Sequence, residues 1–158
     1  MTRIDFYFNV ADKQQAIFDL VQSALSKRRQ VVVFVADEKM ASDVSVSLWQ
    51  NKAESFLPNA RIHSLHSPVT PVVIALQDHN AIKSSTQDDM LINLTKNEPI
   101  FFSRFTQLIE LVSDDEQDKM AARARFKFYR DRGYEIKSTN YAQIWVMGKL
   151  APIRKRFE

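Results

Sequence analysis

The chain has 158 residues, a length that fits one domain able to bury a hydrophobic core without disulfide support. Apolar residues make up 45% and charged residues 26%, as in ordinary globular proteins, and the lack of cysteine excludes disulfides, thiolate chemistry and cysteine-ligated metals. No apolar run approaches the length that crosses a bilayer, and residues 1–8 lack the apolar stretch of a signal peptide.

Charge is distributed unevenly along the chain. The net charge is +3, but residues 1–118 carry 11 Lys/Arg against 16 Asp/Glu, whereas residues 119–158 carry 11 Lys/Arg against 3 Asp/Glu. The C-terminal part is therefore strongly basic, while the rest is mildly acidic. Such asymmetry indicates an anionic partner, and the charge alone leaves nucleic acid, a membrane surface and an acidic peptide open.

The first fifty residues alternate between strand and helix patterns. Apolar and polar side chains alternate over residues 3–8, which predicts a strand, and a continuous β-branched run over 30–36 predicts a buried parallel strand. Residues 12–28 and 37–50 have helical spacing, and each begins at an aspartate that can cap the helix. The inner face of the first helix carries Ile17, Leu20, Val21, Ala24 and Leu25.

The same alternation continues to the C-terminal third of the chain. A strong helix is predicted over 114–132, where Gly133 can supply the left-handed residue that ends it. Further strands are predicted at residues 72–76, 90–94 and 107–112, with a last short strand at 134–136. Segments without a clear pattern are 56–67, 77–88 and 100–105. The sequence therefore predicts a single-domain α/β fold with a mostly parallel sheet flanked by helices.

Glycine is scarce, which limits the ways in which this fold can bind nucleotides. The chain has two glycines, Gly133 and Gly148, and contains neither G-x-G-x-x-G nor a P-loop. Phosphate-binding loops need several glycines so that the backbone can approach the phosphates. We therefore expect a fold that resembles nucleotide-binding domains but has no phosphate-binding loop.

The predicted helix over 37–50 has two apolar faces. The stripe that should face the sheet consists of Met40, Ala41, Val44 and Leu48. A second apolar set, on another side of the helix and just after it, consists of Val46, Trp49, Phe56, Leu57 and Pro58. Trp and Phe are favoured anchors at protein interfaces, so we predict a docking patch here. The alternative is that another element of the same domain covers Trp49.

The predicted helix over 114–132 combines a basic face with an aromatic residue. Its buried stripe is expected to consist of Met120, Ala121, Ala124 and Phe128, and its opposite face of Lys119, Arg123, Lys127 and Arg130. Phe126 is expected to be exposed in the middle of the basic face. A basic helical face is usually only solvated, but here no acidic partner is expected at i±4 beyond the capping end. The pattern therefore predicts an anionic ligand with an aromatic or apolar end.

Catalytic patterns are weak in this sequence. His63 and His66 form an H-x-x-H pair without cysteine or a helically spaced carboxylate, so a metal site is not expected. No G-x-S-x-G elbow is present, and adjacent acidic pairs such as Asp114–Asp115 point in different directions. The opposing hypothesis of an enzyme predicts a deep polar pocket with converging groups of shifted pKa.

Three motifs occur in an order and spacing typical of one family. Phe6–Tyr7 opens the first strand, and D-E-K at 37–39 is followed by L-W at 48–49 and A-E-S-F-L-P at 53–58. The third motif, K-x-x-A-R-x-R-F-K-x-Y-R, spans 119–130. With these motifs the sequence resembles the chi subunit of bacterial DNA polymerase III over about residues 3–140.

The resemblance implies an α/β fold similar to nucleotide-binding domains without a working nucleotide site, in agreement with the scarce glycines. It implies a non-catalytic accessory subunit in DNA replication that needs no cofactor and acts in the bacterial cytoplasm, at the replication fork in the nucleoid. The implied partners are the psi subunit, which links chi to the clamp loader, and the acidic C-terminal tail of single-stranded DNA-binding protein. That tail ends in a Phe bearing the chain's free carboxylate, and contact with DNA would be mostly indirect.

The resemblance also assigns residues to two surfaces. The tail-binding motif falls on Lys119, Arg123, Phe126 and Lys127, and Arg130 continues the same basic face. The psi-contact region falls on Trp49 and Phe56, with Val46, Leu57 and Pro58 beside them. The family often has Tyr at the position of Phe126, Leu-Asp at Val44–Ser45 and His at Asn59, so the detailed contacts differ here.

Residues 1–143 are expected to form the chi-like domain and residues 144–158 a basic extension, for which the resemblance implies no role. The main alternative function is direct binding of single-stranded nucleic acid, because basic residues with an interleaved aromatic also suit unpaired bases.

Overall fold

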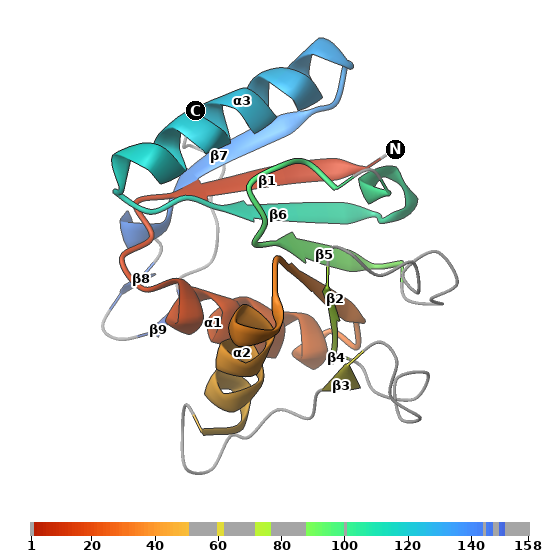
Figure 1. The fold of residues 1–158 in the computed structure, drawn as a ribbon, viewed down its shortest axis with the longest axis vertical. Coiled ribbons are helices and arrows are strands. Elements are labelled where there is room, and N and C mark those ends of the chain that lie inside the picture. Colours follow the sequence, from red (N-terminus) through yellow and green to blue (C-terminus); the bar gives the residue numbers. More distant parts are fainter. Residues whose placement is uncertain are drawn as a thin grey trace.

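The fold is described by a computed structural model over residues 2–50, 60–61, 72–76, 88–99, 101–143, 145–146 and 149–150 (Figure 1). The elements are β1 (Arg3–Phe8), α1 (Lys13–Ser26), β2 (Val31–Val35), α2 (Glu38–Gln50), β3 (Ala60–Arg61), β4 (Val72–Leu76), β5 (Met90–Asn93), η3 (Phe102–Arg104), β6 (Gln107–Leu111), α3 (Glu116–Asp131), β7 (Ile136–Asn140), η4 (Tyr141–Gln143), β8 (Trp145–Val146) and β9 (Lys149–Leu150).

A seven-stranded sheet with the order β3-β4-β2-β5-β6-β1-β7 forms the centre of the molecule. Every pairing in this sheet is parallel, which confirms the predicted α/β class with a mostly parallel sheet. Strands β8 and β9 form a separate antiparallel pair. Strand β1 lies between β6 and β7, so the first strand of the chain is enclosed by two of the last.

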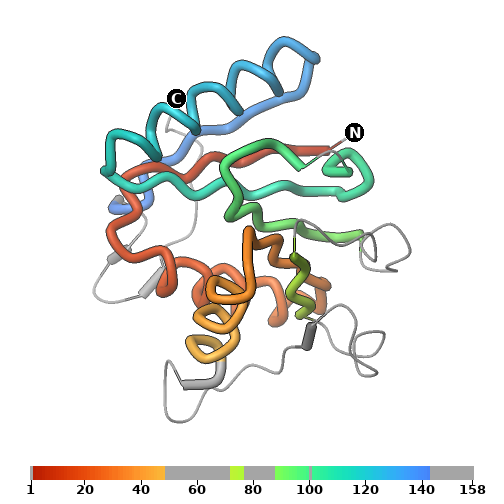
Figure 2. Tube along the Cα trace, in the orientation of Figure 1, coloured from red at the N-terminus to blue at the C-terminus, as the bar shows by residue number. Residues whose placement is uncertain are grey.

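Two hydrophobic clusters cover the two faces of the sheet, because successive side chains of a strand point to opposite sides. In β2, Val31, Val33 and Val35 join the cluster beneath α1 and α2, whereas Val32 and Phe34 join the cluster that packs against α3. Helices α1 and α2 lie side by side in the trace, and α3 lies next to β7 (Figure 2). The fold is therefore a three-layer arrangement, with α3 on the opposite face from α1 and α2.

Most predicted elements are confirmed, including both helix caps at aspartate. Asp12 accepts a hydrogen bond from the Gln15 amide at 3.2 Å, and Asp37 accepts one from the Met40 amide at 2.9 Å. The apolar stripes predicted for α1 and α2 face the core. Gly133 has a φ of 85°, which confirms that it ends α3 in the left-handed conformation.

The bounds predicted for the last strand, residues 134–136, are wrong, because β7 covers residues 136–140. This strand lies at the edge of the sheet and is largely half-buried, so its sequence has only a weak pattern. The segment 100–105, which matched neither pattern, contains the short helix η3. Residues 56–67 and 77–88 lie mainly outside the described ranges, apart from the two-residue strand β3 and Asp88.

The predicted buried stripe of α3 is wrong. The residues of α3 that face the sheet are Ala122, Arg125 and Tyr129. In contrast, Met120 is 65% exposed and Ala124 is exposed, while Ala121 and Phe128 are half-buried. The physical reason is a buried charged group in the sheet, described below, that requires partners from α3. None of the helices in the described ranges combines the length and apolarity that crossing a membrane requires.

Candidate functional site

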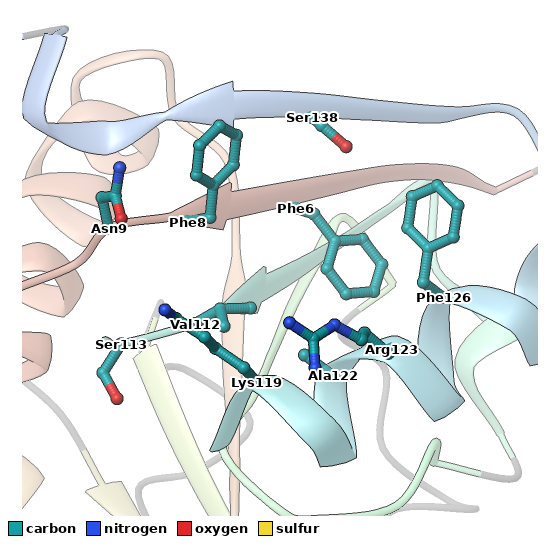
Figure 3. Close-up of a pocket in the computed structure, with 10 residues that line it drawn as sticks. All are labelled: Phe6, Phe8, Asn9, Val112, Ser113, Lys119, Ala122, Arg123, Phe126 and Ser138. Atoms are coloured by element: carbon teal, nitrogen blue, oxygen red, sulfur yellow. The ribbon is translucent and has the colours of Figure 1, made fainter. Parts of the chain in front are cut away.

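An open groove with a volume of about 360 Å³ lies between α3 and the carboxyl ends of β1 and β6. Ten residues line it: Phe6, Phe8, Asn9, Val112, Ser113, Lys119, Ala122, Arg123, Phe126 and Ser138 (Figure 3). Ligands of open α/β sheets bind outside the carboxyl ends of the strands, and this groove lies at that edge. It is therefore the candidate binding site of the described part of the chain.

Local backbone features explain why the groove forms at this position. Strand β1 ends at Phe8, and the next residue, Asn9, has a φ of 61° in the left-handed region that asparagine tolerates better than most residues. Strand β6 leads through Ser113 to Asp115, whose side chain accepts a hydrogen bond from the Asp118 amide at 3.1 Å and caps α3. The chain turns at both points, and the turns set one end of α3 beside the end of β1.

Aromatic side chains form one side of the groove. Phe6 is buried and Phe126 is half-buried, with their ring centroids 5.3 Å apart at an interplanar angle of 62°. Phe8 is 39% exposed on the same strand, two residues from Phe6 and on the same face. Phe126 was predicted to be exposed in the middle of the basic face, and this was wrong, because the orientation of α3 turns it toward β1. It nevertheless lines the groove with part of its surface exposed.

Two cations border the aromatic side. Arg123 is exposed, and its guanidinium makes no ion pair or hydrogen bond with any residue in the described ranges. Lys119 has a long contact with Glu116, with 3.9 Å between the ammonium nitrogen and the carboxylate oxygen. Both side chains extend from α3 toward the groove in Figure 3. The groove therefore offers one guanidinium and one ammonium group close to exposed aromatic carbon.

The other two predicted cations of this helix lie outside the groove. Lys127 pairs with Asp131 at 2.8 Å, and Arg130 approaches the same carboxylate at 3.7 Å. The hydrogen bond from the Lys127 ammonium, together with the nearby positive charges, lowers the pKa of Asp131. The expectation that the basic face has no acidic partner beyond its capping end was therefore wrong, since Asp131 lies at i+4 from Lys127.

The structure thus brings together three of the five residues predicted for the anionic ligand and adds others that sequence reasoning missed. Phe6 and Phe8 were predicted to share one face of the first strand, because residues i and i+2 point to the same side, but they were not predicted to line a binding site. Asn9, Ser113 and Ser138 join the groove through the sheet order, for which the sequence has no local signal.

Asp118 fixes the start of α3 at the mouth of the groove. Its carboxylate accepts hydrogen bonds from the Ser113 amide at 2.8 Å and the Ser113 hydroxyl at 3.0 Å, and pairs with the Lys13 ammonium at 3.0 Å. Burial would raise the pKa of Asp118, but the Ser113 and Lys13 contacts outweigh it and hold the pKa below its ordinary value. This cluster joins the N-terminal ends of α1 and α3.

Replacing Asp118 with asparagine should reduce the free energy of unfolding by about 1–2 kcal/mol at pH 7, because a helix N-terminal charge and its partly buried ion pair are lost. The lowered pKa belongs to the folded state, so the stabilisation is present above the unfolded pKa of about 4 and disappears as pH falls through the folded value. Urea unfolding at pH 7 and pH 3 should show the difference between wild type and Asp118→Asn shrinking at the lower pH. The matched change Asp114→Asn, at an exposed acid beside the same helix start, should cost less than about 0.5 kcal/mol; equal losses would contradict this account.

A buried polar network underlies the groove side of α3. Glu110, which is 0% exposed in β6, accepts hydrogen bonds from Arg125 Nε at 2.9 Å, from the Tyr129 hydroxyl at 2.7 Å and from Asn93 Nδ2 at 3.0 Å. Burial raises the pKa of Glu110, and the Arg125 guanidinium and the other two donors act against that rise. Burial, reinforced by the Glu110 carboxylate, also raises the pKa of Tyr129, so its hydroxyl remains a donor.

The hydrogen bonds of this network run between protein groups only, and they connect α3 to β6, to β5 and to the loop after β5. Arg125 Nη1 donates to the Lys96 carbonyl oxygen at 3.0 Å, and Asn93 Oδ1 accepts from the Thr95 amide and hydroxyl. Both oxygens of the Glu110 carboxylate accept hydrogen bonds from protein groups. Among the described residues, no group of three or more His, Cys, Asp and Glu side chains could hold a metal ion. His63 and His66 lie outside the described ranges.

The second predicted surface is described only at α2. Val46 is 52% exposed and lies away from the buried stripe of Ala41, Val44 and Leu48, as predicted. The side chain of Trp49 lies outside the described part of the chain, as do the residues Phe56, Leu57 and Pro58. The docking patch on this side therefore stays a prediction.

The fold and the groove together define a class: a parallel α/β domain whose candidate site is an open, cationic and aromatic-lined groove. A family model described as the DNA polymerase III chi subunit, HolC, matches residues 1–137. The chain therefore belongs to the chi subunit family of DNA polymerase III, a family of accessory subunits in DNA replication. The resemblance seen in the sequence motifs is confirmed.

Individual relatives agree with the family match. The DNA polymerase III subunit chi of Pseudomonas aeruginosa is 32% identical over 150 residues, which cover 91% of this chain and 100% of the relative. That of Escherichia coli is 27% identical over 128 residues, covering 81% of this chain and 85% of the relative. That of Haemophilus influenzae is 28% identical over 122 residues, covering 77% and 83%.

Proposed function

We propose that this chain connects DNA polymerase III to single-stranded DNA-binding protein. In this proposal the groove beside α3 binds the acidic C-terminal tail of that protein, and a second surface around α2 binds the psi subunit and, through it, the clamp loader. The observation that carries the first part is the combination, in one open groove, of the partly exposed rings of Phe8 and Phe126 with the guanidinium of Arg123, which has no ion-pair partner within the described ranges.

The groove suits a chain end that carries both an aromatic ring and a carboxylate. The guanidinium of Arg123 can hold a carboxylate with two parallel hydrogen bonds, and Lys119 adds a second positive charge. The aromatic ring of the ligand can pack edge-to-face against Phe8 and Phe126, and Phe126 itself packs against the buried Phe6. The preceding acidic residues of the tail would lie in the positive field of the same helix.

The affinity of a single tail is expected to be modest. Charge pairs at an open site are screened by salt, and each pair with the acidic residues that precede the chain end contributes less than about 1 kcal/mol on its own. The contact of Arg123 with the terminal carboxylate, with two charge-assisted hydrogen bonds, is expected to contribute more. Several tails gathered on one protein-coated DNA strand would raise the effective concentration of the ligand. The proposed link is therefore a reversible tether, whereas the apolar psi surface should be much less sensitive to salt.

The experiment that tests the proposal uses three ligands with the intact chain. An acidic peptide ending in Phe with a free carboxylate should bind at least about tenfold more tightly than the same peptide with a C-terminal amide, since the amide removes the charge facing Arg123. A single-stranded oligonucleotide should bind more weakly than the free-acid peptide. Fluorescence anisotropy at two salt concentrations measures all three. Equal affinity for acid and amide, or preference for the oligonucleotide, would contradict the proposal.

Direct binding of single-stranded nucleic acid is the second candidate function. It is favoured by the exposed cations Arg123, Lys127 and Arg130 along one helix, with an exposed aromatic ring at Phe8. The pairing of Lys127 and Arg130 with Asp131 weighs against it, because phosphates would have to compete with a carboxylate already in place. The oligonucleotide in the experiment above separates the two functions.

A further inference from the structure

Helix α3 leaves part of its apolar stripe exposed, although Phe128 packs against the edge of the core. Met120 and Ala124 are exposed and Phe128 is half-buried, while Arg125 and Tyr129 face the sheet. At 3.6 residues per turn, the apolar stripe and the face that is buried lie roughly 120° apart around the helix axis. Something other than apolar burial therefore sets the rotation of this helix.

The group that opposes the apolar rotation is the buried carboxylate of Glu110 on β6. Two of its three hydrogen-bond donors, Arg125 and Tyr129, come from α3 and are one helical turn apart. The third donor, Asn93, comes from the neighbouring strand β5. Arg125 also reaches the Lys96 carbonyl oxygen at 3.0 Å, so its guanidinium holds the helix to the loop after β5 as well as to β6.

Turning α3 to bury Met120 would withdraw both helical donors from Glu110. A carboxylate with no exposure would then keep only one donor, and an unpaired buried charge is among the costliest defects in a folded protein. The same turn would carry Lys119, Arg123 and Phe126 away from β1, because they lie on the flank of the helix next to its buried face. The rotation that satisfies Glu110 is thus also the rotation that forms the groove.

We propose that Glu110, Arg125 and Tyr129 form a rotational lock, a set of positioning residues that selects the orientation of α3 and thereby assembles the groove. The effect of the lock on ligand binding rests on the proposed function of the groove, whereas its effect on helix rotation does not. The lock therefore has two independent readouts, one on the helix and one on the ligand.

The absence of cysteine from the chain gives the first readout. Met120→Cys puts a single thiol on the exposed face of α3, and Ala122→Cys puts one on its buried face. In the otherwise unchanged protein, a maleimide should label Cys at position 120 at least roughly 100-fold faster than at position 122, since a buried site reacts only when the structure opens. This ratio of labelling rates reports the rotation of the helix.

The lock is removed by Glu110→Leu, Arg125→Met and Tyr129→Phe together, which leaves no buried charge without a partner. Asn93 keeps its hydrogen bond to the Asn97 carbonyl oxygen. Apolar replacement of a buried pair is usually tolerated, so the protein should fold with unchanged helical content by circular dichroism. The ratio of labelling rates should fall by roughly tenfold or more, and affinity for the free-acid peptide should fall at least roughly tenfold.

An unchanged ratio in the folded triple variant would overturn the lock, as would loss of peptide binding without a change in the ratio. Arg130→Ala is the matched control, because Arg130 is exposed on the same helix and belongs neither to the lock nor to the groove, so the ratio should stay within about threefold of its original value. If the triple variant does not fold, Arg125→Lys is the alternative, because lysine keeps the positive charge but lacks the planar group that reaches both Glu110 and the Lys96 carbonyl oxygen. The ratio of labelling rates should then still fall several-fold, and an unchanged ratio would overturn the lock. The proposed function and the lock can fail separately. If the unaltered chain does not bind the peptide, but its labelling ratio is as expected and falls in the triple variant, the proposed function is rejected and the lock is supported.

Discussion

Replacing Arg123 with alanine should weaken binding of the acidic peptide by roughly 10- to 150-fold, which corresponds to about 1.5–3 kcal/mol for a lost charge-assisted interaction. Arg123 is the cation of the groove that has no acidic partner within the described ranges, so its removal takes away attraction without releasing a competing pair. The loss should shrink as salt is raised, because screening weakens the same attraction in the unaltered protein. Anisotropy titrations at low and high salt measure both effects.

Lys127→Ala is the matched control for this prediction. It removes the same charge from the same helix, but Lys127 lies outside the groove and is paired with Asp131, so the affinity should change less than about threefold. Binding of psi should be unaffected by Arg123→Ala, whereas Trp49→Ala or Phe56→Ala should abolish psi binding and spare the peptide. Equal effects at Arg123 and Lys127 would contradict the prediction, since they would mean that the overall positive charge of α3, and not the groove, attracts the peptide.

Replacing Arg125 with alanine should reduce the free energy of unfolding by roughly 3–5 kcal/mol, since it leaves the buried Glu110 carboxylate without its ion-pair partner. That is a large share of the 5–15 kcal/mol by which domains are usually stable, so partial unfolding at 37 °C is expected. Urea unfolding followed by circular dichroism measures the change.

Two further variants show whether the cause is the unpaired charge or the lost side chain. Arg130→Ala removes an exposed arginine from the same helix and should cost within about 0.5 kcal/mol. Glu110→Leu combined with Arg125→Met should recover most of the stability lost in Arg125→Ala, because no unpaired charge remains. If the double variant were as unstable as the single one, packing rather than charge would explain the importance of Arg125.

Most of the fold was predictable because its elements have strong local patterns. The β-branched run of β2 and the aspartate caps of α1 and α2 are read within a few residues, and Gly133 marks the end of α3. Strand β7 was misplaced because an edge strand buries little and has no clear alternation. The strand order, which places β1 between β6 and β7, depends on contacts between distant residues and has no local signature.

The candidate site was only partly predictable, for a related reason. Lys119, Arg123 and Phe126 were identified from their spacing on one helix, and the structure places them in one groove. The orientation of that helix was predicted wrongly, because the prediction used only the spacing of apolar residues within the helix. That spacing contains no information on Glu110 in β6, which binds Arg125. A buried charged residue in a strand can be predicted from sequence only when the residue that pairs with it is known.

The position of β1 between β6 and β7 also determines when, during synthesis, the sheet around the groove can form. Its pairing with β6 joins Arg3 to Gln107, and its pairing with β7 joins Phe8 to Asn140. A nascent chain therefore carries its first strand for more than a hundred residues before either neighbour leaves the ribosome. The lining of the groove includes Ser138 of β7, so an unfinished chain that ends before β7 lacks part of the candidate site.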